Sequence, residues 1–163
     1  MRFELTHRYA WPAAEVAAAY ADADLYPALA GLPKLGGAEV LSRQATGDEV
    51  ELRIRYRFTG DLNPAVTAVV DPAKLTWVEE STHDLATGTV SWRLVPDHYA
   101  DRLKASGRYR FTDEGGRAVR RTDGDLKVRA LLVASTVERA IVSGLEEHFD
   151  AEVAAVDAYL ADR

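Results

Sequence analysis

The sequence has 163 residues, of which 47% are hydrophobic and 28% charged, a composition typical of a folded globular protein. Its 20 Lys and Arg against 26 Asp and Glu give a formal net charge of −6, which argues against general binding to nucleic acids or anionic membranes. There is no cysteine, which excludes disulfides, thiol catalysis and Cys-ligated metal sites. No signal-peptide run and no stretch of the roughly 20 apolar residues needed to span a bilayer is visible. We therefore expect one cytoplasmic domain over residues 1–163, without an integral membrane segment.

The N-terminal part predicts a strand followed by two short helices. Residues 3–9 alternate between apolar and polar, with His7 in phase with the apolar side chains. Pro12 suits the first position of a helix, and the Ala-rich run 13–21 favours helical structure. A second short helix is expected up to about Ala30, beginning at Asp22 or Asp24.

The middle of the chain predicts strands joined by short turns. We expect strands at about 38–46, 49–58, 75–81, 89–95, 104–112 and 117–129, and a short helix at 63–70 that begins after Asn63. The strand 49–58 alternates most regularly, with Val50, Leu52, Ile54, Tyr56 and Phe58 on one face. Its other face carries Arg53, Arg55 and Arg57, which we interpret as a solvated stripe paired with Glu80 and Asp84 of a neighbouring strand.

The C-terminus predicts one long helix at about 132–160. Its apolar residues recur every three or four positions and form one stripe: Val137, Ile141, Leu145, Phe149, Val153, Val156 and Leu160. Seven strands with one dry face require a cover, and a helix of this length can lie across them. The predicted class is α+β, with a curved antiparallel sheet around the helix and a pocket between them.

This element order resembles the START-like, birch-pollen-allergen-like superfamily, which has the helix-grip fold, over essentially the whole chain. Locally, Asp125–Val128 running into Thr136–Ile141 resembles an actinobacterial family of START-like proteins of unknown function. Superfamily members bind hydrophobic small molecules such as lipids and polyketides, and a minority catalyse cyclisation or dehydration. The resemblance therefore implies an internal cavity for a small hydrophobic ligand.

Residues on the dry faces are the candidate walls of this cavity. They are His7, Tyr9, Tyr56, Phe58, Trp77, Trp92, Tyr109, Phe111, Ile141, Leu145 and Phe149. Aromatic walls suit a planar or apolar ligand, although plain core packing is the more common role of any single aromatic residue. Val66, Val69 and Val70 of the short helix are candidates for a lid over the mouth.

Two polar positions could carry chemistry. An inward His7 could orient a ligand carbonyl or act as a general base, or it could simply be satisfied by a neighbouring group in the core. Glu79 shares a face with Trp77, Ser81 and His83, so an inward face would bring a carboxylate into the pocket, whereas a β-bulge would place Glu80 there instead. If the protein is an enzyme, the acid–base candidates are His7, Tyr56 and Glu79.

Other classes of site find no support in the sequence. The four histidines form no pair with metal-ligand spacing, and no nucleophile elbow, phosphate loop or dinucleotide fingerprint occurs, so we expect no metal and no cofactor. The leading hypothesis is a monomeric or homodimeric binder of a small hydrophobic molecule. The alternatives are a cyclase- or dehydratase-like enzyme and a protein-interaction module with a filled core.

Overall fold

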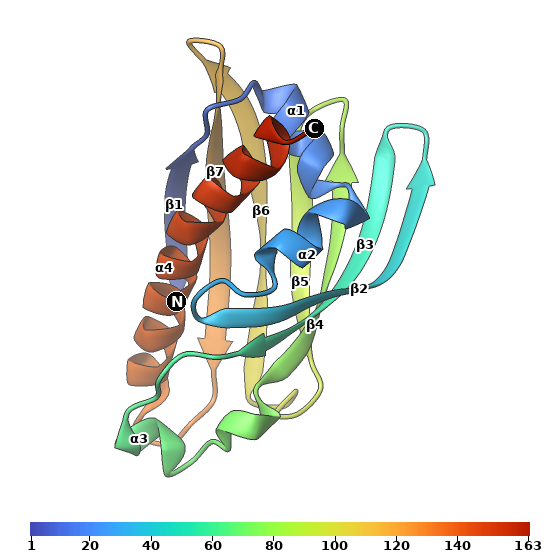
Figure 1. Cartoon of the computed structure of the whole chain (residues 1–163). Helices are drawn as coiled ribbons and strands as arrows, with labels where there is room; N and C mark the ends of the chain where they lie inside the picture. The colour runs from blue at the N-terminus through green and yellow to red at the C-terminus, as the bar shows by residue number, and fades with distance from the viewer.

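In the computed structural model, which describes residues 1–163, a seven-stranded antiparallel sheet curves around the C-terminal helix α4 (Figure 1). The strand order is β1-β7-β6-β5-β4-β3-β2. The strands are β1 (Arg2–Arg8), β2 (Leu35–Thr46), β3 (Glu49–Phe58), β4 (Thr76–Asp84), β5 (Thr89–Pro96), β6 (Leu103–Glu114) and β7 (Arg117–Val128). The helices are α1 (Ala13–Tyr20), α2 (Tyr26–Leu29), α3 (Pro64–Thr67) and α4 (Ala134–Ala161), with short 3-10 turns at Ala23–Leu25 and Pro72–Lys74. The predicted α+β class and the predicted order of elements are confirmed.

The two faces of the sheet differ as the alternation of β3 predicts. Val50, Leu52 and Ile54 point inward and are almost completely buried. On the outer face, Arg53 pairs with Glu80 at 3.3 Å and Arg55 pairs with Asp97 at 3.1 Å. These pairs confirm a solvated stripe, although its second acidic partner comes from the loop after β5 and not from β4.

Three predicted boundaries are wrong, and the backbone gives the reason for the first two. Strand β2 begins at Leu35 and not at Ala38, because a register shift between Gly36 and Glu39 lets the pairing with β3 continue past Gly37, whose φ of +92° suits only glycine well. Helix α4 begins at Ala134, since Leu132 has a left-handed φ of +68° and cannot be helical. The helix expected at 63–70 contains only Pro64–Thr67.

The two halves of α4 lie in different surroundings. The C-terminal half packs against α1 and α2, where Val156 and Leu160 join the main hydrophobic core. Figure 1 shows α1 and α2 covering the end of the sheet near the C-terminus, with α3 at the opposite end. The N-terminal half of α4 therefore faces the concave sheet without a helix between them. No helix in the structure combines the length and the apolar character that crossing a bilayer requires.

Candidate functional site: a cavity between the sheet and helix α4

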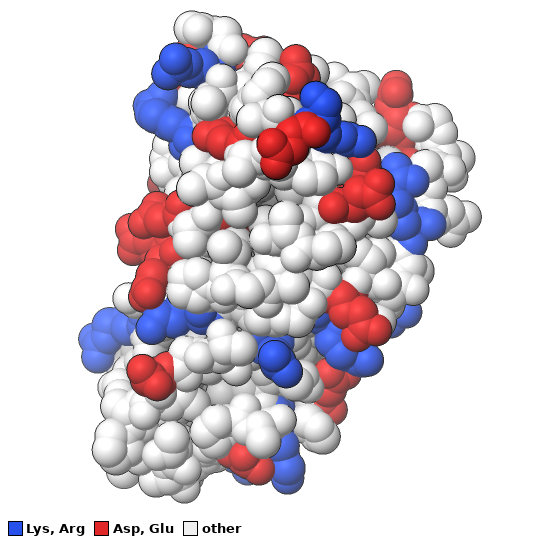
Figure 2. Space-filling view, viewed as in Figure 1, with Lys and Arg blue, Asp and Glu red and all other residues white.

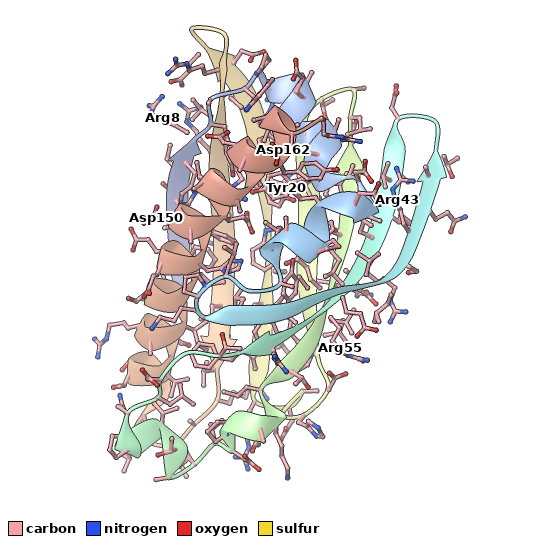
Figure 3. All side chains as sticks on the ribbon, in the orientation of Figure 1. Arg8, Tyr20, Arg43, Arg55, Asp150 and Asp162 are labelled. Carbon is pink, nitrogen blue, oxygen red and sulfur yellow. The ribbon has the colours of Figure 1, made fainter.

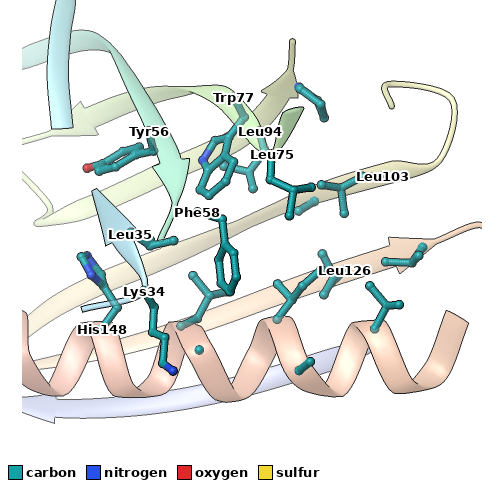
Figure 4. Close-up of a pocket in the computed structure, with 18 of the residues that line it drawn as sticks. Lys34, Leu35, Tyr56, Phe58, Leu75, Trp77, Leu94, Leu103, Leu126 and His148 are labelled. Atoms are coloured by element: carbon teal, nitrogen blue, oxygen red, sulfur yellow. The ribbon is translucent and has the colours of Figure 1, made fainter. Parts of the chain in front are cut away.

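A cavity of about 390 Å³ lies between the concave face of the sheet and the N-terminal half of α4. Hydrophobic residues make up 26 of the 42 residues that line it, so its walls are mainly apolar (Figure 4). The predicted wall residues that line this cavity are Tyr56, Phe58, Trp77, Trp92, Tyr109, Ile141, Leu145 and Phe149, and all three predicted lid residues, Val66, Val69 and Val70, line it as well.

Three predicted wall residues lie outside the cavity. Tyr9 and Phe111 are buried in the core beneath α1, where their rings meet edge to face at 6.1 Å. His7 lies between β1 and α4, with its Nε2 3.5 Å from a carboxylate oxygen of Asp150 on the rim of the molecule. The alternation of β1 correctly predicts that His7 and Tyr9 face inward, but α1 and the C-terminal half of α4 fill this end of the sheet.

The mouth of the cavity lies between α4 and the connections at the α3 end of the sheet. Lining residues that are also exposed come from four segments: Asp61, Val69 and Lys74 from the β3–β4 connection, His98 and Arg102 from the β5–β6 connection, Arg129 from the β7–α4 connection, and Ala140, Ser143 and Glu147 from the helix. Figure 4 shows Phe58 reaching from β3 toward α4 with Lys34 beside it. Gly144 lies beneath these two side chains, and Lys34 is bound to Glu147 at 3.4 Å.

At the inner end of the cavity, a buried ion pair joins β7 to α4. Arg120 Nη1 lies 2.8 Å from Glu152 Oε1, and it also donates to the Tyr20 hydroxyl at 2.9 Å. The Tyr20 hydroxyl donates to Glu152 in turn, and Figure 3 shows Tyr20 pointing from α1 into the interior. Burial disfavours the Glu152 carboxylate, but the adjacent Arg120 and His148 outweigh it and lower its pKa to about 2. The pair is therefore ionised at neutral pH.

Aromatic rings surround the Arg120 guanidinium. Its central carbon lies 4.5 Å from the ring centre of Phe149, 5.3 Å from that of Tyr20 and 5.6 Å from that of Tyr109. Its Nε and Nη2 atoms are buried and have no hydrogen-bond partner. The negative faces of the rings therefore provide part of the stabilisation that water would give an exposed guanidinium.

His148 completes this polar cluster from the helix. Its Nδ1 lies 3.0 Å from the carbonyl oxygen of Pro33, and its Nε2 lies 3.3 Å from the second carboxylate oxygen of Glu152, one helical turn away. The imidazole is 1% exposed. Both ring nitrogens are thus engaged, so His148 orients Glu152 and ties α4 to the loop before β2.

Glu79 is the ionisable side chain that lines the cavity next to its aromatic wall. It lies on β4 between Trp77 and Ser81, and the pairing of β4 with β3 runs without a bulge, so Glu79 faces inward and Glu80 faces outward. Desolvation by burial, with repulsion from Glu152, raises the pKa of the Glu79 carboxyl to about 7. Both protonation states are accessible near neutral pH.

The remaining polar residues of the β4 inner face lie beyond the cavity. Ser81 Oγ and His83 Nε2 are 3.0 Å apart and buried. Burial, with Arg43 nearby, lowers the pKa of His83 to about 4, so the imidazole is neutral in the native state. Glu79 and His83 therefore do not form a common site.

Arg120, His148 and Glu152 were not among the residues predicted from the sequence to form the site. Arg120 follows the inward phase of Ala118, Thr122 and Leu126 on β7, a signal that its charge obscured. The helix positions Gly144, His148, Glu152, Val156 and Leu160 recur every four residues and are all buried. Both Glu152 and His148 are buried despite their polarity, because Glu152 pairs with Arg120 across the interior and the His148 ring lies within hydrogen-bond distance of the Pro33 carbonyl oxygen.

The family described as "Protein of unknown function (DUF2505)" matches residues 4–160 of the chain. No curated protein matches the chain in sequence. The solved structure of the Zhui aromatase/cyclase from Streptomyces sp. R1128 is 20% identical and has a TM-score of 0.64, over 100% of this chain and 94% of that one.

Two further structures share the same architecture. Norcoclaurine synthase from Thalictrum flavum is 15% identical with a TM-score of 0.62, covering 100% of this chain and 87% of that one. TTHA0849 from Thermus thermophilus is 15% identical with a TM-score of 0.67, covering 99% and 98%. At these identities the likeness concerns the fold, and it confirms the START-like helix-grip architecture that the order of elements predicts.

Proposed function

This chain belongs to the DUF2505 family, and from the geometry of its cavity we propose that it binds a small hydrophobic molecule there. The observation that carries the proposal is the unfilled, mainly apolar space of about 390 Å³ in the fold. Cavities of about 300 to 1,000 Å³ with apolar walls and a few polar groups are typical of small-molecule sites. The same space argues against an interaction module with a filled core.

The walls favour a ligand with a flat apolar part. Tyr56 and Trp77 lie side by side with ring centres 6.3 Å apart and planes inclined by 27°, and Leu94 and Leu145 also line the cavity. A ligand entering this space exchanges water for aromatic and aliphatic contacts, which contributes about 25 cal/mol for each Å² of apolar surface removed from water. Binding would be driven mainly by desolvation.

Polar groups at the inner side of the cavity would orient the ligand. Glu79 can donate a hydrogen bond when protonated or accept one when ionised, and the Tyr56 and Tyr109 hydroxyls offer further partners. Burial raises the pKa of both tyrosines well above the ordinary value, so they remain protonated donors. In this proposal Glu79 and these hydroxyls orient the ligand, and His7, which lies outside the cavity, does not.

A second candidate function is a cyclase-like reaction on a ligand in the same cavity. The observation in its favour is Glu79, whose pKa of about 7 suits a general acid or base near neutral pH. The Zhui protein, which is similar in fold, is named an aromatase/cyclase. Of the three acid–base candidates, Glu79 and Tyr56 line the cavity and His7 does not. Replacing Glu79 by Gln would abolish a reaction but leave binding of an apolar probe nearly unchanged.

A dye titration with two matched variants tests the binding proposal. The wild type, Ala140→Trp and Ala154→Trp are titrated with an anilinonaphthalene sulfonate, following fluorescence and the thermal midpoint together. Both alanines are exposed on α4, but only Ala140 lines the cavity. We expect saturable binding near one equivalent, a Kd raised at least about tenfold by Ala140→Trp, and no change with Ala154→Trp. Equal binding by all three proteins, or no saturable binding, would contradict the proposal.

A further inference from the structure

Two adjacent leucines protrude from the connection between β7 and α4. Leu131 is 93% exposed and Leu132 is 100% exposed, whereas the other exposed large hydrophobic residues lie between 37% and 42%. Leu132 also has a left-handed backbone with φ of +68°, a conformation that aliphatic residues rarely adopt. The chain thus holds two large apolar side chains in solvent on a strained turn. Packing within the protein does not explain this exposure.

These leucines lie at the mouth of the cavity. Arg129 and Ala130, which precede them, line the cavity, and α4 begins at Ala134. Figure 1 shows this connection beside α3 at the same end of the molecule. In the view of Figure 2 the surface around α3 is mainly uncharged, and Val69 there is 42% exposed.

The charges at this end are unevenly paired. Lys74, Arg102 and Arg129 line the mouth, are exposed and take part in no ion pair, in contrast to Arg53 and Arg55 on the outer face of the sheet. Three acidic groups at this end, Asp61, Asp71 and Asp101, also take part in no ion pair, whereas Asp125 and Glu138 lie near the N-terminal amine. The charges tied most directly to the leucines are nevertheless positive, since Arg129 lies two residues before Leu131 and its N–H donates to the Arg102 carbonyl oxygen at 2.7 Å.

We propose that this end of the molecule docks on an anionic lipid bilayer, with Leu131 and Leu132 in the interface and Lys74, Arg102 and Arg129 against the headgroups. Leucine side chains flanked by cations are the arrangement that interfacial membrane segments use. The net charge of −6 opposes binding by the surface as a whole. At physiological salt, however, charges beyond about 8 Å are screened, so the cations beside the leucines matter more than the net charge of the chain.

A bilayer fits this tip better than a protein partner does. A stable protein interface takes about 800 Å² from each partner, over a broad complementary surface. Two leucines on one protruding turn offer a small convex tip, which a bilayer accepts without a complementary shape. The docking does not depend on whether the cavity holds a ligand. It would, however, place the mouth of the cavity against the bilayer, where hydrophobic molecules dissolve.

Vesicle sedimentation tests the proposal on the intact chain. The wild type is mixed with phosphatidylcholine vesicles with and without phosphatidylglycerol, beside the double variants Leu131→Ser/Leu132→Ser and Leu41→Ser/Leu85→Ser. The control leucines are also exposed, at 37% each, but lie on β2 and on the turn after β4, away from the mouth. We expect salt-sensitive binding to anionic vesicles, a loss of about tenfold or more in partitioning for the first double variant, and no loss for the control.

A second measurement reports insertion directly. Since the chain has no cysteine, Leu132→Cys and Leu41→Cys each provide one site for a polarity-sensitive fluorophore. Anionic vesicles should shift the emission of the label at 132 to the blue and leave that at 41 unchanged. Absence of sedimentation, equal sedimentation of the two double variants, or self-association that depends on Leu131 and Leu132 would overturn the proposal. A dye titration of Leu131→Ser/Leu132→Ser separates this outcome from failure of the cavity proposal, because the cavity should still bind.

Discussion

Glu152 Oε1 lies 2.8 Å from Arg120 Nη1, and the two side chains are 5% and 2% exposed. The pair links α4 to β7, at the boundary between the filled core and the cavity. A buried ion pair contributes little net stability compared with apolar packing, but loss of one partner leaves an uncompensated charge in the interior. The pair therefore ties α4 to β7 at the inner end of the cavity, and the fold depends on both partners being present.

The first prediction concerns this pair. Glu152→Gln leaves the Arg120 charge unpaired and should reduce the free energy of unfolding by about 3 to 5 kcal/mol in urea denaturation. The control is Arg53→Gln, which breaks an ion pair with Glu80 on the outer face and should cost less than about 1 kcal/mol. Equal effects of the two substitutions would show that the buried pair is not a structural link.

The second prediction concerns the pH dependence of stability due to Glu79. Its carboxyl has a pKa of about 7 in the fold against 4.5 for an ordinary Glu, so the folded state keeps the proton to higher pH. The free energy of unfolding should therefore fall as the pH rises through this window, whereas Glu79→Gln removes this dependence. Between about pH 5 and about pH 8, the wild type should lose on the order of 2 to 3 kcal/mol relative to the variant. Parallel pH profiles of the two proteins would contradict the assignment.

The third prediction has the opposite sign and concerns His83. Its pKa is about 4 in the fold and 6.5 for an ordinary His, so the unfolded chain takes up the proton first as the pH falls. Stability should decline from about pH 6.5 toward about pH 4, by on the order of 3 kcal/mol for this residue alone. His83→Gln should flatten that part of the acid-unfolding curve, and an unchanged curve would show that other groups cause the acid loss.

The sheet could be predicted from the sequence because alternation directly encodes which face of a strand is dry. Along β3, apolar residues alternate with arginines: Val50, Leu52 and Ile54 face inward, and Arg53 and Arg55 face outward. Both faces could therefore be assigned from the sequence. The position of Glu79 could be predicted only conditionally, since one bulge would have exchanged it with Glu80. Which inward residues line the cavity depends on where the helices pack, and His7 lies against Phe149 and Asp150 of α4, outside the cavity.

The buried charges could not be predicted for a related reason. Hydropathy assigns Arg120 and Glu152 to the surface, and only their contact across the interior makes burial of both acceptable. Each residue stands at an inward-facing position of its strand or helix. The position along one element, however, does not reveal that an opposite charge faces it from another element.

The fourth prediction concerns the lid. The Asn63 side chain accepts a hydrogen bond at 3.0 Å from the Val66 N–H and so caps α3, whose Val66 is 2% exposed over the cavity. Asn63→Ala should weaken α3 by about 1 kcal/mol. If α3 gates the mouth, dye association and dissociation should both accelerate in stopped-flow traces, with little change in Kd.

The control for the lid is Asp84→Ala, which removes a similar cap from the turn after β4, away from the mouth. It should leave both dye rates unchanged. Rates for Asn63→Ala that equal those of the wild type would indicate that ligands enter by another route.

The most direct measurement is a crystal structure of the chain with the anilinonaphthalene dye bound. We predict that the naphthalene ring lies inside the cavity, in contact with Trp77 and Leu145, with a polar atom of the dye toward Glu79 or the Tyr109 hydroxyl. A dye bound only on the outer surface, beside an empty cavity, would contradict the claim that this protein holds a small hydrophobic molecule between its sheet and α4.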